Sequence, residues 1–332
     1  MTTDENDLEP IEPETARELF LDHKANNCAD STVYNHRYHL NSFLEWCERN
    51  DVDNLNDISG RDVQAYRLWR KETSDINKVT MKVHMSTLRV FLKWAASIEA
   101  VDENLYDKIL VPRVRPEEQQ RDETLDAERA QKIVEYLSTF QYASKEHVLI
   151  ALLWETGIRI GSANSLDVAD VDFENGHLRL VHRPEMGTTL KNAQGGERLI
   201  AVSSDLLKVL DDYIDERRIP IEDDYGRRPL LTTRQARMSR ATMRRIVYRV
   251  TAPCFFDEPC TDCSDSDDVR CGDAVNPHAI RRGSITHYLS EDVPIDVVSD
   301  RMNVGRKTLE KHYDQRSEEI KVEQRREHIE SI

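Results

Sequence analysis

A proline- and charge-rich segment, residues 111–123, divides this chain into two regions with different patterns. It contains Pro112 and Pro116, many charged side chains and few apolar ones, which is typical of a linker. The chain has 332 residues, enough for two domains that each bury a core. We therefore predict an acidic tail (1–12), a helical domain (13–112), a linker (113–122) and a second domain (123–332).

The composition excludes several classes of protein. The chain has 46 Lys and Arg residues against 62 Asp and Glu residues, a net charge of −16, which argues against non-specific coating of nucleic acid or anionic membranes. Only 13 of the basic residues are lysine, and an acidic, lysine-poor surface is typical of salt-rich cytoplasms. The longest apolar run, Val148–Trp154, is far shorter than the roughly 20 residues of a membrane span. The N-terminus carries six carboxylates in 14 residues and no Lys or Arg, unlike a secretory leader, so we expect a cytoplasmic protein.

The first region has the apolar periodicity of a helical domain. Apolar residues recur at helical spacing in residues 31–49 and 57–70. Asp30 or Ser31 is available to cap the first of these helices, and Ser59 the second.

The clearest helix of this region is predicted at residues 78–96. One face is apolar, and consists of Met81, Met85, Leu88, Leu92 and Ala95. An adjacent face is basic, and consists of Lys78, Lys82, Arg89 and Lys93. The basic face is either an ordinary solvated surface or one that follows DNA phosphates.

The second region has a mixed pattern. Helices are predicted at 126–139 and 146–156, and short strands at 178–182 and 198–203. The glycine-rich sequence Asn192–Gly196 lies between these strands and predicts a β-hairpin. The remainder of the chain, from Ser204, has a mostly helical pattern.

One predicted helix, residues 234–250, carries a concentrated basic stripe. Its apolar residues fall on one side of a helical wheel, and five arginines fall on the other: Arg237, Arg240, Arg244, Arg245 and Arg249. Such a stripe in an acidic chain suits phosphate contact, although salt bridges to the surplus carboxylates are the alternative.

Five residues of the second region suit phosphate chemistry. Arg159 closes the sequence Glu-Thr-Gly-Ile-Arg, Lys191 precedes the glycine-rich turn, and Tyr313 lies 32 residues after Arg281. His278 and Arg281 form an H-x-x-R box on one face of a helix that starts near Pro277. Singly, each has an ordinary alternative, such as a capping arginine, a turn lysine or a half-buried tyrosine.

Together and in this order, Arg159, Lys191, His278, Arg281 and Tyr313 resemble the active-site residues of the tyrosine recombinase (phage integrase) family. The resemblance covers about residues 12–325 and is strongest to integrases of halophilic archaea and their viruses. It implies a mainly α fold with a small β-hairpin or sheet: a helical, SAM-like core-binding domain followed by an α+β catalytic domain that ends in a helix.

The resemblance also implies the role of each residue. Arg159 and Arg281 would neutralise the charge that develops on the phosphodiester, since guanidinium groups bind phosphate oxygens in pairs. Tyr313 would be the nucleophile and form a 3′-phosphotyrosyl bond. Lys191 would protonate the leaving 5′-oxygen, and His278 would bind the phosphate or accept the tyrosine proton.

The partners and cofactors follow from the same resemblance. The substrate would be double-stranded DNA on which four protomers assemble, with no cofactor for catalysis; the C-terminal segment 314–332 would pack on a neighbouring protomer or be a frayed helix. Phosphate contacts weaken in high salt, so we expect the 234–249 arginines to reach base edges as well. Two alternatives remain: a DNA-binding protein that has lost the chemistry, and a type IB topoisomerase-like relaxase.

Two positions depart from the family pattern. Val304 stands nine residues before Tyr313, where the family usually has His or Trp, which removes an expected phosphate donor. Loss of one such donor typically lowers the rate about 10²- to 10³-fold. Ser162 stands where an acidic residue is common. The nearby residues that could replace the missing donor are Arg306, Lys307 and His312.

Four cysteines lie just before the H-x-x-R box: Cys254, Cys260, Cys263 and Cys271. They could supply four thiolates to a structural zinc, which would fix an acidic loop that cannot bury a core of its own. The spacing contains one C-x-x-C and not two, so four unliganded thiols are the alternative.

Overall fold

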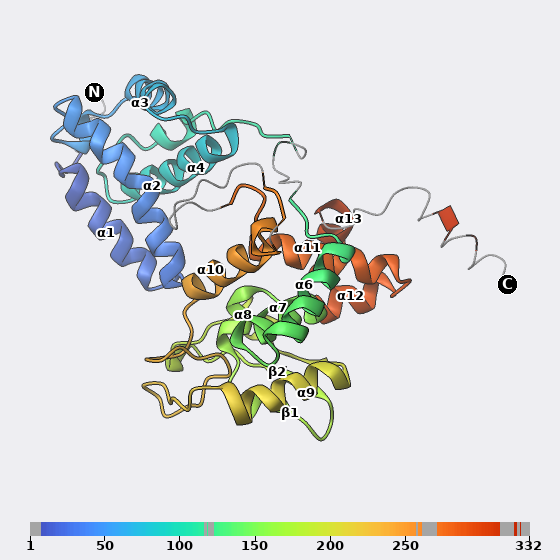
Figure 1. Ribbon diagram of the computed structural model, residues 1–332. Helices are drawn as coiled ribbons and strands as arrows, with labels where there is room; N and C mark the ends of the chain where they lie inside the picture. Colours follow the sequence, from blue (N-terminus) through green and yellow to red (C-terminus); the bar gives the residue numbers. More distant parts are fainter. Residues whose placement is uncertain are drawn as a thin grey trace, which may run out of the picture. The chain divides into compact units, whose positions relative to one another are not determined.

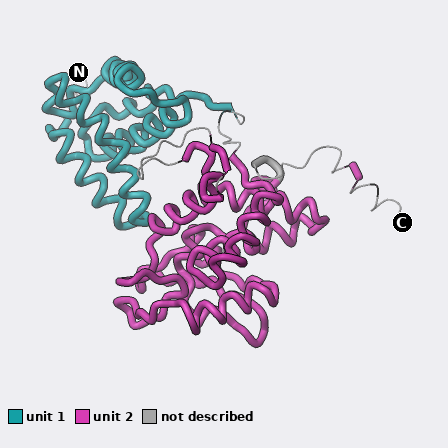
Figure 2. The backbone as a smooth tube through the Cα atoms, viewed as in Figure 1, with its two compact units in different colours: residues 1–121 teal, residues 122–332 magenta. Residues whose placement is uncertain are grey.

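The computed structural model describes residues 8–115, 118, 123–256, 258–260, 271–312, 322–323 and 326. The chain forms two compact units, residues 1–121 and 122–332, coloured separately in Figure 2. This division falls inside the segment 113–122. Among the described residues, helices dominate and three strands form one small antiparallel sheet, so the predicted mainly α fold is confirmed. No described helix is long and apolar enough to span a membrane.

Unit 1 is a helical bundle. Its four longer helices are α1 (Pro13–Ala25), α2 (Asp30–Arg49), α3 (Gly60–Glu72) and α4 (Lys78–Ala96). A 3₁₀ turn at Leu55–Asp57 lies between α2 and α3, and another at Leu105–Lys108 follows α4. Aromatic and aliphatic side chains from all four helices form its core, among them Phe20, Phe43, Tyr66, Leu88 and Phe91.

The helices of unit 1 follow the sequence pattern closely. The bounds of α4 coincide with those predicted, its five predicted core residues are buried, and Asn77 caps it by accepting a hydrogen bond from the amide of Thr80. Ser59 caps α3 as predicted, in a capping box with Asp62. The predicted cap of α2 is wrong: its N-cap is Ala29 and has no side-chain bond, so Asp30 lies inside the first turn, where its negative charge suits the helix dipole.

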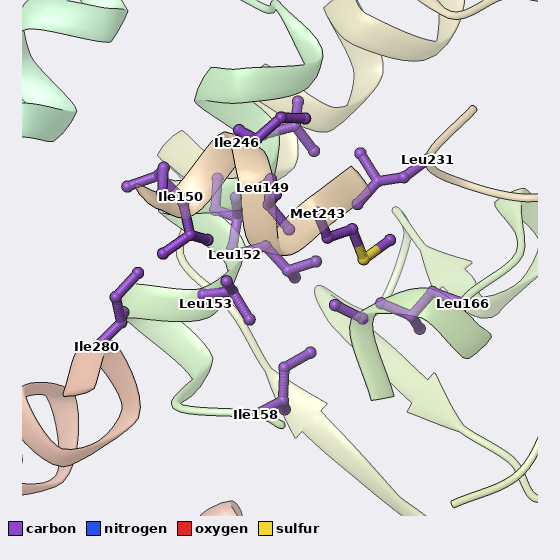
Figure 3. Close-up of a cluster of buried hydrophobic side chains, with 14 of the residues drawn as sticks. Leu149, Ile150, Leu152, Leu153, Ile158, Leu166, Leu231, Met243, Ile246 and Ile280 are labelled. Carbon is purple, nitrogen blue, oxygen red and sulfur yellow. The ribbon is translucent and has the colours of Figure 1, made fainter. Parts of the chain in front are cut away.

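Unit 2 is built around α7 (Lys145–Thr156), which contacts the surrounding helices in Figure 1. These are α6 (Ala127–Phe140), α8 (Ile160–Ser165), α9 (Ser204–Asp212), α10 (Arg240–Thr251) and α11 (Pro277–Ser290). Figure 3 shows side chains from α7, α10 and α11 meeting in this core, among them Leu149, Leu153, Met243, Ile246 and Ile280. A smaller apolar cluster joins α11 to α12 (Ile295–Met302) and α13 (Arg306–His312).

The sheet consists of β1 (Val171–Asp172), β2 (His177–Leu180) and β3 (Arg198–Ala201), in that order. The predicted pairing of the two longer strands is present, with Leu180 opposite Arg198. The predicted glycine-rich segment does form a 3₁₀ turn, at Ala193–Gly196, but the connection is not a tight hairpin. Residues 181–197 join the strands by a longer path that also contains a 3₁₀ turn at Pro184–Met186. A proline cannot donate a ladder hydrogen bond, which favours such a departure from the hairpin. We call residues 181–197 the Lys191 loop.

The predicted helix 234–250 is shorter in the structure, because α10 starts at Arg240. Ser239 has extended backbone angles and accepts a hydrogen bond from the amide of Thr242, which makes it the N-cap. Thr232 and Arg237 pair in an isolated β-bridge before the helix. Residues 218–239 are therefore irregular, and Arg237 does not belong to the helical stripe.

Candidate active site

Arg159 is positioned by the turn that ends α7. Gly157 adopts a left-handed conformation with φ +58°, and a side chain there would meet the sulfur of Met302 at 2.7 Å, so the turn requires glycine. Two residues later Arg159 is the N-cap of α8, half-buried, with its guanidinium donating to the carbonyl of Asn303 at 3.3 Å. The glycine-containing turn thus brings this arginine to the end of α12.

Arg281 is positioned by α11. The helix starts at Pro277, and the side chain of Asn276 caps it by accepting hydrogen bonds from the amides of His278 and Ala279. Arg281 is only 1% exposed. Its guanidinium donates to the carbonyls of Gly157 at 2.5 Å and Met302 at 2.7 Å, which fixes it beside the same α7 turn and α12 end that Arg159 contacts.

The pKa of His278 is lowered by its surroundings in the site. Desolvation and the positive charges of its neighbours lower its pKa to about 4, so the ring is neutral at pH 7. The neighbours that exert this effect are Arg282, Arg281, Arg159 and Lys191. The structure therefore brings four of the five predicted site residues together and adds Arg282, which is 8% exposed. We call these five residues the His278 cluster.

Lys191 is exposed in the Lys191 loop. The loop is joined to the end of α12 by the side chain of Asn303, which donates to the carbonyl of Gly195 and accepts from the side-chain amide of Asn192, both at 2.8 Å. The sequence pattern identified Lys191 but neither Asn303 nor Arg282. Arg282 is adjacent to Arg281 in the sequence, which is a weak signal. Asn303 had no local signal, because its partners are more than 100 residues away.

The fifth predicted residue, Tyr313, lies outside the described residues, and directly follows the last residue of α13. Val304 is 5% exposed and packs in the apolar cluster of α11, α12 and α13, so its side chain serves the core. Of its suggested substitutes, Arg306 pairs with Asp296 at 3.4 Å, Lys307 is exposed, and the side chain of His312 is not described. Ser162 is 7% exposed and carries no charge.

The predicted basic stripe of residues 234–250 separates into two groups. Arg237 donates to Asp167 at 2.5 Å and Asp223 at 2.7 Å, and Arg249 pairs with Glu146 at 2.7 Å, so for these two the salt-bridge alternative holds. The other three lie exposed on α10: Arg240, Arg244 and Arg245.

The predicted basic face of α4 is largely engaged within unit 1. Lys78 pairs with Glu118 at 2.8 Å, Arg89 donates to the carbonyl of Ile109, and the ammonium of Lys93 lies 5.6 Å from the ring centre of Tyr106. Lys82 lines a groove of about 460 Å³ between α2 and α4, together with His36, Val83 and Val90.

Three of the four predicted zinc ligands converge. The sulfur atoms of Cys254, Cys260 and Cys271 lie within 4.8 Å of one another, next to the segment that leads into α11. A tetrahedral zinc with Zn–S bonds of about 2.3 Å separates its sulfur ligands by about 3.8 Å, so this cluster could hold a metal ion after a small adjustment. Cys263 lies outside the described residues.

Comparisons with known proteins agree with this geometry. Residues 123–319 match the phage integrase family, and residues 18–98 match the phage integrase N-terminal SAM-like domain. A tyrosine recombinase of Pseudothermotoga lettingae is 24% identical over 273 residues, 82% of each chain. Tyrosine recombinase XerA of Pyrococcus furiosus is 22% identical over 289 residues, 86% of this chain and 82% of that one.

A solved structure shares the fold. The Tn1549 transposon integrase, solved in complex with transposon right end DNA, is 16% identical and has a TM-score of 0.68, and the match covers 95% of this chain and 99% of that one. The family match extends over more than half of the chain and includes four residues of the His278 cluster that the resemblance named. The chain therefore belongs to the phage integrase family, the family of the tyrosine recombinases.

Proposed function

We propose that this protein is a site-specific DNA recombinase that cleaves and rejoins strands through a 3′-phosphotyrosyl bond. The observation that carries the proposal is the His278 cluster, in which three arginines and one lysine lie near enough to an exposed histidine to lower its pKa and keep it neutral. Concentrated positive charge beside hydrogen-bond donors suits the extra negative charge of a phosphoryl transition state. This supports DNA phosphate as the reacting group.

Each step follows from the residue types. The hydroxyl of Tyr313 loses its proton, to His278 or to solvent, and its oxygen attacks the phosphorus while Arg159 and Arg281 neutralise the non-bridging oxygens. The bond to the 5′-oxygen breaks, and the ammonium of Lys191 gives that oxygen a proton. The phosphoester is conserved in the link to Tyr313. Attack by a 5′-hydroxyl of another strand reverses these steps, so no nucleotide or metal is needed for energy.

Exposed cations outside the active site are the proposed DNA contacts. On α10 these are Arg240, Arg244 and Arg245. In unit 1 they are Lys82 and, after exchange of their internal partners for phosphate, Lys78, Arg89 and Lys93. We leave out Arg237 because two carboxylates already neutralise it.

We further propose that residues 13–112 and 123–332 act as a core-binding and a catalytic domain on double-stranded DNA, and that four protomers assemble there. The acidic, lysine-poor composition supports work in the cytoplasm of a halophile. The buried Val304 supports a slower variant of the reaction, because the usual donor at this position is absent.

We also propose that the cysteine cluster binds one structural zinc ion, with Cys263 as the fourth ligand. The test is the zinc content of the purified protein after dialysis, together with the effect of a chelator on the melting temperature. We expect one zinc per chain, lost in the Cys260→Ser and Cys271→Ser variants and retained in Cys28→Ser. Retention of the zinc by Cys263→Ser would show that Cys263 is not a ligand. A wild-type protein without zinc would show that the cysteine cluster is not a zinc site.

The test of the proposed reaction is a covalent adduct. The protein is incubated in high salt with nicked DNA substrates from its own genetic neighbourhood, quenched with detergent, and compared with Tyr313→Phe. We expect an adduct that the variant lacks. Binding without an adduct would favour the non-catalytic alternative. In a second reaction with supercoiled plasmid, relaxed product without exchanged partners would favour the topoisomerase-like one.

A further inference from the structure

Asn303 occupies a special backbone position between two residues that the active site uses. It caps the C-terminus of α12 with φ +49°, a left-handed conformation that asparagine tolerates better than most residues. The carbonyl of Met302, just before it, accepts from Arg281, and its own carbonyl accepts from Arg159. Both active-site arginines are therefore tied to the main chain at this point.

The side chain of Asn303 extends this connection to the Lys191 loop. Its Nδ2 donates to the carbonyl of Gly195 at 2.8 Å, and its Oδ1 accepts from Nδ2 of Asn192 at 2.8 Å. These partners are one and four residues after Lys191 in the chain. An amide is suited to this task because it offers a donor and an acceptor at once.

The loop needs such an anchor because residues 191–195 are all exposed. Ala193 has φ +47°, so the loop adopts a conformation that is unfavourable for its residue type. At its far end, Arg198 donates to the carbonyls of Gly196 and Arg301, which fixes the start of β3. The stretch beside Lys191 itself is anchored by Asn303.

We propose that Asn303 is a positioning residue for the general acid. Its amide holds the Lys191 loop in a fixed position relative to Arg159 and Arg281, so that the ammonium of Lys191 contacts the leaving 5′-oxygen. The inference rests on the proposed function, because it assigns to Lys191 the role of acid. A displaced catalytic group costs on the order of 10- to 100-fold in rate, because an error of about 1 Å is already costly.

The test uses two DNA substrates in single-turnover cleavage. One is ordinary, and the other carries a sulfur in place of the 5′-bridging oxygen at the cleavage site. A thiolate leaves without protonation, so this substrate does not need the general acid. The variants are Asn303→Gly, which keeps the left-handed backbone accessible, and Asn192→Ala, which removes one bond of the anchor without touching α12. Lys191→Ala is the reference for a lost acid.

We expect both anchor variants to cleave ordinary DNA about 10- to 100-fold more slowly than the wild type and to recover most of that loss on the sulfur substrate, as Lys191→Ala does. The matched control is Asp292→Gly, which places glycine at another positive φ in the same unit, +61°, in the connection between α11 and α12. It should cleave both substrates at the wild-type rate.

Two outcomes would overturn the inference. Equal losses on both substrates would show that Asn303 and Asn192 act on folding or phosphate binding and not on the acid. Wild-type rates of both variants on ordinary DNA would show that the anchor is dispensable. Failure of the proposed function is a separate result, because the wild-type protein would then form no adduct with either substrate.

Discussion

Unit 2 contains two groups of arginines with opposite surroundings. In the first, each guanidinium contacts carboxylates, and the side chains are largely buried. We call this group the acid–arginine cluster, and its six members are Arg183, Arg227, Arg237, Asp167, Asp170 and Asp223. The shortest pair of each arginine is Arg237–Asp167 at 2.5 Å, Arg183–Asp170 at 2.6 Å and Arg227–Asp223 at 2.9 Å. The second is the His278 cluster, where the four charges that shift the pKa of the histidine are all positive.

The difference shows that arginine content alone does not identify a phosphate site. In the acid–arginine cluster the charges neutralise one another and join the sheet region to the segment before α10. In the His278 cluster, Arg281 donates to two main-chain carbonyls, which fix the position of its guanidinium. A site for phosphate keeps its positive charge in excess, whereas a structural cluster does not.

The largest expected effect comes from the acid–arginine cluster. Asp167→Ala removes a carboxylate that contacts Arg183, Arg227 and Arg237, and leaves these guanidiniums buried with less compensation. We expect a loss of about 3 to 5 kcal/mol in the free energy of unfolding, measured by urea denaturation. The exposed Asp224→Ala is the control. A loss no larger than that of the control would show that the cluster is not structural.

The next effect separates catalysis from stability in the His278 cluster. Arg281→Lys retains a charge but cannot bind two oxygens in parallel. We expect single-turnover cleavage to fall about 10²- to 10³-fold while non-covalent binding of DNA changes little. The exposed Arg217→Lys should behave like the wild type. If Arg281→Lys lost binding and cleavage equally, its role would be in affinity for the ground state.

The sequence revealed what depends on neighbours along the chain. The bounds and buried face of α4 follow from its periodicity, and the proposed active-site residues were named through the resemblance of their order to a known family. Arg237 was assigned to a helical stripe because its partners Asp167 and Asp223 are distant in the sequence, so no local pattern could show them. The long connection between β2 and β3 was missed for the same reason, since its path depends on contacts with α12.

A smaller effect tests which arginines of α10 meet DNA. Arg244→Gln and Arg245→Gln each remove one exposed charge, so each should lower the slope of log affinity against log salt by about 1. Arg249→Gln, whose charge already pairs with Glu146, is the matched control on the same helix. The measurement is binding to cognate and scrambled DNA across a salt series. A changed slope with unchanged sequence preference would contradict base-edge contacts by these residues.

The smallest effect concerns the protonation of His278. Its pKa is lowered to about 4 from an ordinary 6.5, so the unfolded chain binds more protons between these values. The contribution of this group to stability is therefore complete above pH 6.5 and is lost as pH falls toward 4. A bound phosphate adds negative charge next to the ring and raises its pKa, so DNA binding should take up less than one proton near pH 5 to 6 and none near pH 8.

Calorimetry of DNA binding in two buffers with different ionisation enthalpies measures this proton uptake. His278→Gln should abolish it. His177→Gln should not, because His177 lies on β2, where its ring is beside Asp172 of β1. Equal uptake by the wild type and His278→Gln would place the titrating group elsewhere. It would then break the comparison of the two arginine groups, because DNA binding would leave the protonation of the His278 cluster unchanged.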